Sequence, residues 1–288
     1  MPTLNEVKEQ MIVVGSVGEF TNALQQIATI HMMKLRTQVL ASRPFVETAA
    51  ALLSELAALR NTLAAEDLLK LEKKHEETKV ASGHTAVIII TSNQGLTGRY
   101  NIEIYQKLEK VLIEEKDADF FIIGHKGQEL FQTGKFKVHN FPYEVPENFT
   151  IADLTRLIGM FDYYTKITLI YSHYVNSATR EVLNISVVAP VIEAAPLEKD
   201  SKSLGKYTYE PDIDELIEGV SKTLRAALFQ QQIMDARLSQ YSAQMIGMKT
   251  ASDNANHLLA DLRVDYNKQR RKLIDKKISE VFAGSALW

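Results

Sequence analysis

The sequence predicts a protein of mixed α+β and α/β class: a long antiparallel coiled coil of the N- and C-terminal helices, with an inserted Rossmann-like α/β domain. Residues 212–288 contain no proline and only Gly219, Gly247 and Gly284. Residues 1–80 hold few glycines and prolines, and alanine and leucine dominate their second half. Most glycine, aromatic and β-branched residues lie between these segments. We therefore expect helical arms at residues 1–80 and 209–288 around an α/β domain at residues 81–208.

The C-terminal arm carries the strongest periodic pattern. Its apolar residues step alternately by four and three positions from 213 to 273, and fifteen of the eighteen positions are apolar or aromatic. A period of about 3.5 residues over this length predicts a left-handed coiled coil, about 110 Å long, that needs a partner helix. The core of this coiled coil is expected to include Leu238, Tyr241, Met245, Met248, Ala255, Leu259, Leu262 and Tyr266.

The N-terminal arm is expected to supply the first partner helix, paired antiparallel because the arms stand at opposite ends of the chain. Pro44 divides its apolar residues into two series and lacks a backbone N–H, so it predicts a kink or a restarted helix. The first series is Leu24, Ala28, Met32, Leu35 and Val39, and the second is Phe45, Ala49, Leu52, Leu56, Leu59 and Leu63.

The middle of the chain alternates between strand-like and helix-like segments. Runs of β-branched and aromatic residues predict strands at 86–91, 120–124, 136–141, 168–172 and 182–189. Helices are expected at 100–116 and 151–164, with a shorter one at 128–133. This alternation predicts a small Rossmann-like sheet.

The stretch "TSNQGLTGRYN" at 91–101 joins the first strand to a helix, the position of a phosphate loop in many nucleotide enzymes. A dinucleotide fingerprint needs three spaced glycines, and a P-loop needs a Lys-Ser/Thr pair after its last glycine. This stretch has only Gly95 and Gly98, followed by Arg99 and Tyr100. We interpret it as a structural turn and expect no cofactor, metal or catalytic residue, while a nucleotide-dependent enzyme stays open as an alternative.

Composition excludes several classes of function. A formal net charge of −3 and a pI near 6.2 argue against a protein dedicated to nucleic acid. The absence of cysteine excludes disulfides and thiolate chemistry, and the seven histidines are scattered. The N-terminal segment lacks the pattern of a secretory signal, and no window is apolar enough to span a membrane, so the expected location is cytoplasmic.

Several motifs bear a family resemblance. "TSNQGLTGRYN" resembles the Ser-Asp-Arg-Gly-Leu-Cys-Gly-Gly-Phe-Asn motif of the γ subunits of F-type ATP synthases. The run "AQMIGMKTASDNANHLLADLRVDYNKQRRKLIDKKISEVFAGSALW" is similar to that family's C-terminal signature, and "ASRPFVET", "YSHYVNSA" and "YTYEPDIDEL" also match. The resemblance covers essentially the whole chain. It implies a non-catalytic rotor: the arms form the shaft inside the α3β3 catalytic head, and the α/β domain forms the foot on the ε subunit and the c-ring. It also implies a peripheral place on the cytoplasmic side of a bacterial plasma membrane.

The resemblance further implies two partner contacts near the C-terminus. Contact with the catch loops of the β subunit is expected from Asn267, Arg270, Arg271, Asp275, Lys277, Ser279 and Glu280, and the bearing tip from Ala283, Gly284, Leu287 and Trp288. Some charges depart from the family pattern: Glu19, Asn22 and His31 stand where lysines are usual. This divergence leaves open a related, mainly hydrolytic rotary ATPase, and a self-contained coiled-coil scaffold is the remaining alternative.

Overall fold

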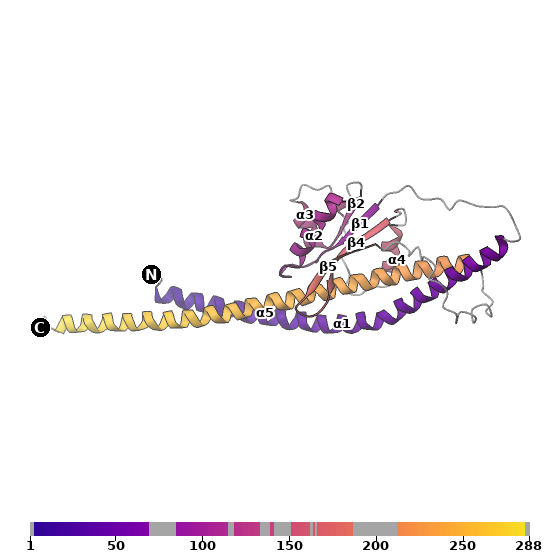
Figure 1. The fold of residues 1–288 in the computed structure, drawn as a ribbon. Coiled ribbons are helices and arrows are strands. Elements are labelled where there is room, and N and C mark those ends of the chain that lie inside the picture. The colour runs from indigo at the N-terminus through magenta and orange to yellow at the C-terminus, as the bar shows by residue number, and fades with distance from the viewer. Residues whose placement is uncertain are drawn as a thin grey trace.

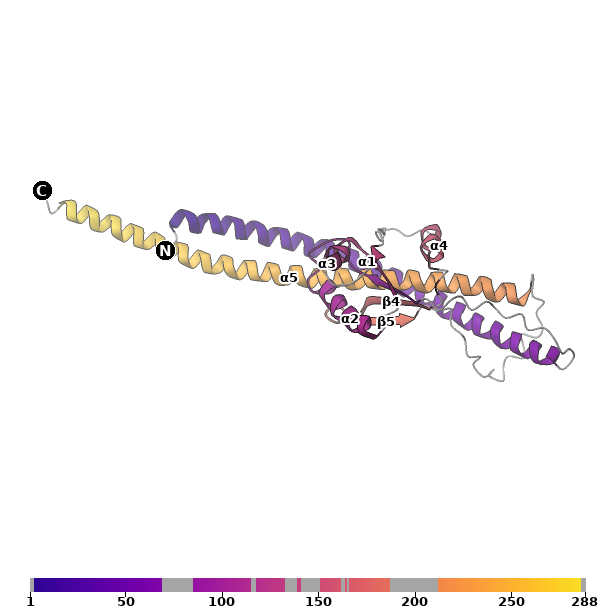
Figure 2. The ribbon, with the colours of Figure 1, turned by 90° about the horizontal axis from the view of Figure 1, so that it is seen from above.

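The computed structural model describes residues 3–68, 85–114, 118–132, 139–140, 151–161, 164, 166–186 and 212–285. Two long helices, α1 (Leu4–Leu68) and α5 (Ile213–Ser285), lie side by side, and a sheet domain of residues 85–186 lies against α5 (Figure 1). Both chain termini lie at the same end of the molecule, where α5 extends past the start of α1 (Figures 1 and 2). The architecture is therefore a helix pair with one small mixed sheet on its side.

The two long helices run antiparallel. At one end Arg60 of α1 forms an ion pair with Asp214 of α5, with 2.9 Å between Nε and Oδ1. Further along, the rings of His31 and Tyr241 stack with centroids 4.8 Å apart. Nearer the termini, a Cβ placed on Gly18 would meet the Ala255 Cβ at 3.5 Å. By this offset Leu4, the first residue of α1, lies level with Gln269.

Helix α5 buries a heptad series of positions against α1. Between residues 249 and 283 the side chains that are not exposed are almost all members of the series that begins at Ile213. Beyond Gln269 every described side chain is exposed. The reason is that α1 starts level with Gln269 and does not extend along the last turns of α5. The buried or half-buried members in this part of α5 are Ser252, Ala255, Leu259, Leu262, Tyr266 and Gln269.

Helix α1 continues through Pro44 without a break, which corrects the expected restart. Pro44 is exposed, so the carbonyl left without an amide partner can be hydrated. Because the helix is continuous, its heptad phase is preserved, and the second predicted series is correct only in part: Ala49 is half-buried and Leu56 is buried, whereas Phe45 and Leu52 are 55% and 43% exposed. The positions turned toward α5 are 28, 32, 35, 39, 42, 46, 49, 53 and 56, all buried or half-buried. Leu63 lies outside the described side chains.

The sheet has the strand order β3-β2-β1-β4-β5. Strands β1 (Thr85–Ile90), β2 (Asp119–Ile123), β3 (His139–Asn140) and β4 (Lys166–Tyr174) are parallel, and β5 (Arg180–Ser186) pairs antiparallel with β4. Helices α2 (Tyr100–Glu114), α3 (His125–Gln132) and α4 (Ile151–Gly159) follow β1, β2 and β3 along the chain. Each predicted strand and helix of this domain overlaps one of these elements. Residues 136–138, 141 and 187–189 of the predicted strands and residues 115–116, 133 and 162–163 of the predicted helices lie outside the described residues.

Two apolar clusters cover the two faces of the sheet. On one face Val87 and Ile89 pack with Tyr100, Ile104 and Leu108 of α2. On the other face the cluster draws on β1, β4, α4 and α5, and its members include Ile88, Ile90, Leu169, Leu157, Phe229, Ile233 and Ala236. Helix α5 is thus one layer of the sheet domain as well as one half of the helix pair.

Candidate functional site

The middle of α5 is enclosed by two partners. Leu238 packs with Met32, Leu35 and Val39 of α1, while Ala236 belongs to the cluster on the sheet. Side chains between residues 224 and 248 are all buried or half-buried, unlike those on either flank. Figure 1 shows α5 running between the sheet domain above it and α1 below it. The middle of α5 is therefore shared between the sheet domain and the helix pair.

A row of polar contacts joins the sheet domain to α5, and we call it the polar seam. The hydroxyls of Ser172 on β4 and Ser239 on α5 are 2.7 Å apart and buried. The Ser242 hydroxyl donates to the Ser177 carbonyl at 2.8 Å. The Tyr100 hydroxyl donates to the Ala236 carbonyl at 3.2 Å, and burial raises the pKa of this phenol, which stays protonated and able to donate. Directional bonds of this kind fix where the domain sits on the helix.

The one carboxylate of the polar seam is Asp235, which is 5% exposed. Its Oδ2 lies 2.5 Å from Nδ1 of His173, and its Oδ1 accepts the Tyr174 backbone N–H at 3.4 Å. Burial raises the pKa of the Asp235 carboxyl, and the hydrogen bond and charge of His173 offset that rise only in part. Sequence reasoning missed this pair because its members are 62 residues apart.

The glycine loop after β1 lies directly on α5. A Cβ added to Gly98 would meet the Ala243 carbonyl oxygen at 3.5 Å, and one added to Gly247 would meet the Gly98 Cα at 3.6 Å. Gly98 has a φ of +58°, which glycine adopts without strain. The other left-handed residue of the loop is Leu96, with a φ of 64°, and not Gly95. The backbone conformation therefore favours glycine at 98, whereas a Cβ at this position would only reach ordinary van der Waals contact with the helix.

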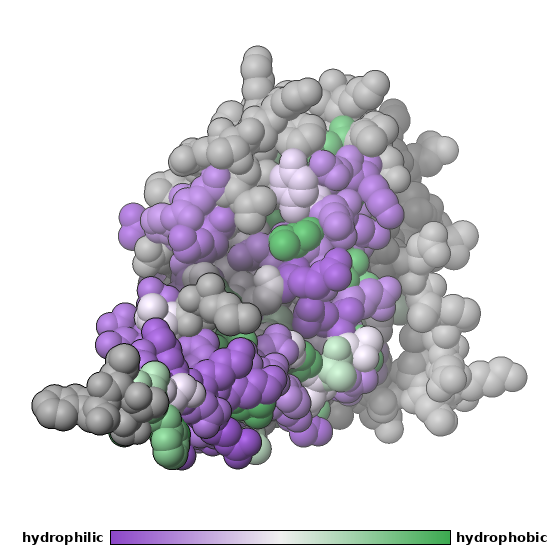
Figure 3. Space-filling view, turned by 90° about the vertical axis from the view of Figure 1, so that its left-hand side faces the viewer, coloured by the Kyte–Doolittle hydropathy of each residue, from purple (hydrophilic) through white to green (hydrophobic). Residues whose placement is uncertain are grey.

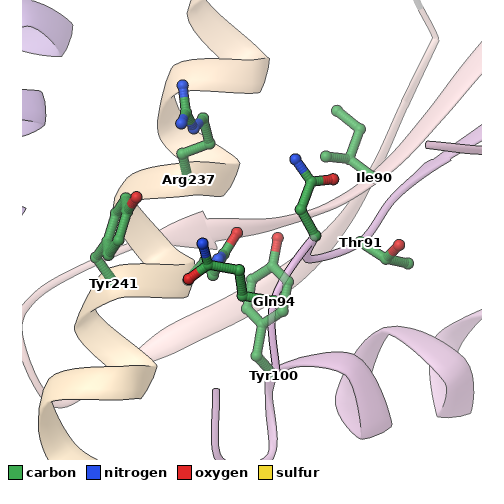
Figure 4. A pocket seen from close by; sticks show the side chains of 8 residues that line it. Ile90, Thr91, Gln94, Tyr100, Arg237 and Tyr241 are labelled. Carbon is green, nitrogen blue, oxygen red and sulfur yellow. The ribbon is translucent and has the colours of Figure 1, made fainter. Parts of the chain in front are cut away.

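A small cavity lies where this loop meets α5. It measures about 70 Å³ and is lined by Ile90, Thr91, Asn93, Gln94, Tyr100, Arg237, Gln240 and Tyr241. Figure 4 shows Gln94 and Tyr100 on the loop side and Arg237 and Tyr241 on the helix side. Ligand pockets usually measure about 300–1,000 Å³, so this space suits a few water molecules rather than a nucleotide.

The far end of α5 carries the residues expected to contact a partner. Asn267, Arg270, Arg271, Asp275, Lys277, Ser279, Glu280 and Ala283 are all exposed on the outer turns of the helix. The structure brings none of these polar side chains against α1; Ser279 bonds back to the Asp275 carbonyl, and Lys276 pairs with Glu280 at 3.8 Å. Gly284 lies in α5, and Leu287 and Trp288 lie outside the described residues.

Apolar side chains on the same outer turns were not singled out from the sequence. Ile274, Ile278 and Val281 are 47%, 48% and 71% exposed and repeat at steps of four and three. That spacing places them on one helix face. A search for a second apolar series with steps of four and three, starting at Ile274, would have identified this face from the sequence. Viewed from this end, the described surface is mostly hydrophilic with separate apolar patches (Figure 3).

Helix α1 also exposes large apolar side chains that neither α5 nor the sheet domain covers. They lie outside the heptad positions that face α5, and several are more than half exposed. They are Ile12, Val13, Val17, Phe20, Ile27, Ile30, Met33 and Leu40. A set of this many exposed apolar side chains on one helix differs from apolar residues scattered singly over a surface. It is typical of a protein–protein contact.

Comparison with known proteins identifies the family. The family model described as ATP synthase matches residues 3–287. An ATP synthase gamma chain of Flavobacterium johnsoniae is 31% identical over 294 residues, covering 99% of this chain and 98% of that protein. The chain belongs to the ATP synthase gamma chain family. A gamma chain of Psychrobacter sp. is 28% identical and covers 99% of both sequences.

Solved structures agree with the gamma chain family in fold. A chain from the central stalk and c-ring structure of the Tetrahymena thermophila mitochondrial ATP synthase superposes with a TM-score of 0.57 at 16% identity, covering 81% of this chain and 99% of that one. A chain from the Euglena gracilis mitochondrial enzyme gives 0.56 at 13% identity, covering 88% and 93%. This chain thus shares its fold with chains of both structures although little sequence identity remains.

Among the described residues, two further features concern metal binding and the crossing of a membrane. In that part of the chain, no three His, Asp or Glu side chains come together as a metal site would require. None of the helices described there has the length and apolar character needed to cross a membrane.

Proposed function

We propose that this chain is the central-stalk rotor subunit of an F-type ATP synthase, which transmits rotation between the membrane c-ring and the catalytic α3β3 head. The observation that carries the proposal is the match to gamma chains over residues 3–287, combined with two long antiparallel helices, α1 and α5. A rotor couples ion flow to ATP synthesis or hydrolysis by its shape and its contacts, without chemistry of its own.

The two arms, residues 1–80 and 209–288, form a coiled-coil shaft. The burial of heptad positions on both α1 and α5 supports this assignment, because only a period of about 3.5 residues keeps one face turned to a partner over so many turns. Residues 81–208 form a Rossmann-like foot on the ε subunit and the c-ring. The parallel order of β3, β2, β1 and β4 supports the Rossmann-like interpretation.

The catalytic head receives the exposed end of α5. One shaft among three β subunits presents a different face to each, so the three sites hold different conformations and affinities at any moment. Arg270, with Arg271 beside it, makes the charged contact with a β-subunit catch loop, joined by Asn267, Asp275, Lys277, Ser279 and Glu280. Ala283, Gly284, Leu287 and Trp288 form the tip that turns in the bearing of the head. The exposure of the described residues of this set supports a partner at this end.

The chain is a non-catalytic subunit without a cofactor, and it meets the membrane only through the complex, on its cytoplasmic face. The glycine loop at Gly95 and Gly98 is structural: its contact with α5 supports a packing role over a phosphate site. Its partners are the α and β subunits, the ε subunit and the c-ring, and no nucleic acid.

The test is reconstitution of the complete complex from this chain and the other subunits encoded with it. We expect one copy per three β subunits, ATP-driven rotation of a bead attached to the sheet domain, and ATP synthesis in vesicles with an ion gradient. Rotation with hydrolysis but no synthesis would indicate the mainly hydrolytic relative. Stable homodimers that ignore α and β would indicate a scaffold, and nucleotide binding by the isolated chain would indicate an enzyme.

A further inference from the structure

The polar seam lies on the route by which torque passes from the sheet domain to the helix pair. Apolar contacts across the same boundary, such as those of Phe229 and Ile233, hold the two parts together but allow small rotations, because dispersion attraction has little directional preference. Hydrogen bonds do have a preferred direction. The residues that set the angle between the domain and the helix are therefore expected among the polar contacts.

Asp235 makes the most specific of these contacts. Each of its oxygens is engaged by β4: Oδ2 by the imidazole of His173 and Oδ1 by the backbone N–H of Tyr174. Two bonds from one rigid carboxylate to adjacent residues of one strand define both the position and the rotation of that strand relative to α5. The flanking contact of Ser172 with Ser239 lies one turn along α5.

The charged and titratable groups around Asp235 come from four elements. Arg43 on α1 acts on its carboxylate through space, His173 and Tyr171 stand on β4, Tyr100 stands on α2, and Arg180 on β5 acts on Tyr100. His173 is the one in direct contact, and its side chain is 33% exposed. A carboxylate that stays buried at a net electrostatic cost is weak evidence for stability and better evidence for a specific arrangement.

We propose that Asp235 is a positioning residue of the rotor: its bonds to His173 and Tyr174 fix the angle of the sheet domain on α5, so that rotation entering through the domain turns the helix pair without slack. This inference rests on the proposed rotor function. It assigns a mechanical role to one carboxylate outside the catch residues and the bearing tip.

Two substitutions separate this role from simple packing. Asp235→Ala removes both bonds without leaving a buried charge. Asp235→Asn keeps them in another form: its amide oxygen accepts the Tyr174 N–H, and its NH2 donates to Nδ1 of a His173 protonated on Nε2. The readout is the ratio of ion-driven ATP synthesis to ATP hydrolysis by the complete complex in vesicles. We expect the alanine variant to lower that ratio by about two- to thirty-fold, and the asparagine variant to stay near wild type.

An engineered disulfide supplies the second arm, because the natural chain has no cysteine. The hydroxyls of Ser172 and Ser239 are 2.7 Å apart, so cysteines at both positions can form a bond of about 2.0 Å with small adjustments. In the Asp235→Ala chain, the oxidised Ser172→Cys/Ser239→Cys pair should restore the ratio. Reduction of the same sample should abolish the restoration, and each single-cysteine variant is the control for oxidation of other subunits.

The results decide between the two proposals. An alanine variant with the wild-type ratio, or a formed disulfide that restores nothing, would overturn the positioning role of Asp235. If Asp235→Ala fails to assemble, His173→Ala is used with the same disulfide arm, and the same two results decide. A wild-type complex that assembles and hydrolyses ATP but neither rotates nor synthesises would instead remove the rotor proposal itself.

Discussion

Truncation of Leu238 tests the contact between the two long helices. This side chain is 2% exposed and packs with Met32, Leu35 and Val39 of α1. Leu238→Ala removes three carbon atoms, worth about 2.4 kcal/mol at about 0.8 kcal/mol each. The cavity left behind adds to this, toward an upper end of about 5 kcal/mol. Flexible methionines nearby can close part of the space, so we expect a loss of about 3 kcal/mol.

The assay is thermal unfolding of the purified chain followed by far-ultraviolet circular dichroism. A loss of about 3 kcal/mol corresponds to a decrease in Tm of roughly 6–12 °C for a chain of this size class. Leu258→Ala is the matched control, because Leu258 is the same residue type on the same helix but 49% exposed. Its effect should stay within about 0.5 kcal/mol. Equal shifts for the two variants would refute the described packing of α1 on α5.

The remaining predictions concern the tip, the loop and the buried acid. Arg270→Ala should leave assembly of the complex intact while lowering ATP turnover or its coupling to ion transport, because only a guanidinium can bond a catch-loop carboxylate in a fork; normal, coupled turnover would exclude the catch role. Gly98→Ala should cost about 1–2 kcal/mol in urea unfolding because of its φ of +58°. Gly219→Ala, with nothing within 4 Å, should instead stabilise by up to about 1 kcal/mol, and the opposite signs are the check. Asp235→Asn should match the stability of the wild type at low pH and exceed it increasingly as pH rises above the ordinary carboxyl value of 3.8. The sign follows because the pKa of Asp235 is raised in the folded state, so the wild-type protein loses stability as pH rises through that pKa. Thermal unfolding of both proteins at several pH values would measure the difference.

The pattern of α5 was readable from the sequence because its heptad positions are nearly all apolar. The buried face of α1 was readable only in part: Ala28, Met32, Leu35 and Val39 are buried as predicted. Elsewhere Gly18, Thr21 and Ser42 occupy positions that face α5, while Phe45 and Leu52 point away from it. Small and polar residues let the two backbones approach, but they carry no hydropathy signal. The expected break at Pro44 concealed the register further, because it suggested that the phase restarts there.

The strands and helices of the sheet domain were predictable from their composition, but their use of α5 as a covering layer was not. Ala236 and Ile233 read as ordinary members of a helical arm, and nothing local connects them to Ile88. The same holds for Asp235 and His173, which only the fold brings together. The one local sign that Asp235 had a partner is that it is the only acidic residue between positions 219 and 252.

The unequal lengths of the two helices give the molecule a graded resistance to bending. In the middle, three layers are packed together: α1, α5 and the sheet domain. Toward the termini two helices remain, and residues 270–285 continue for about 24 Å as a single helix. A thicker rod bends far less than a thin one under the same load, so elastic deformation concentrates in the single helix. That end can therefore bend without changing the angle at which the sheet domain lies on the middle of α5.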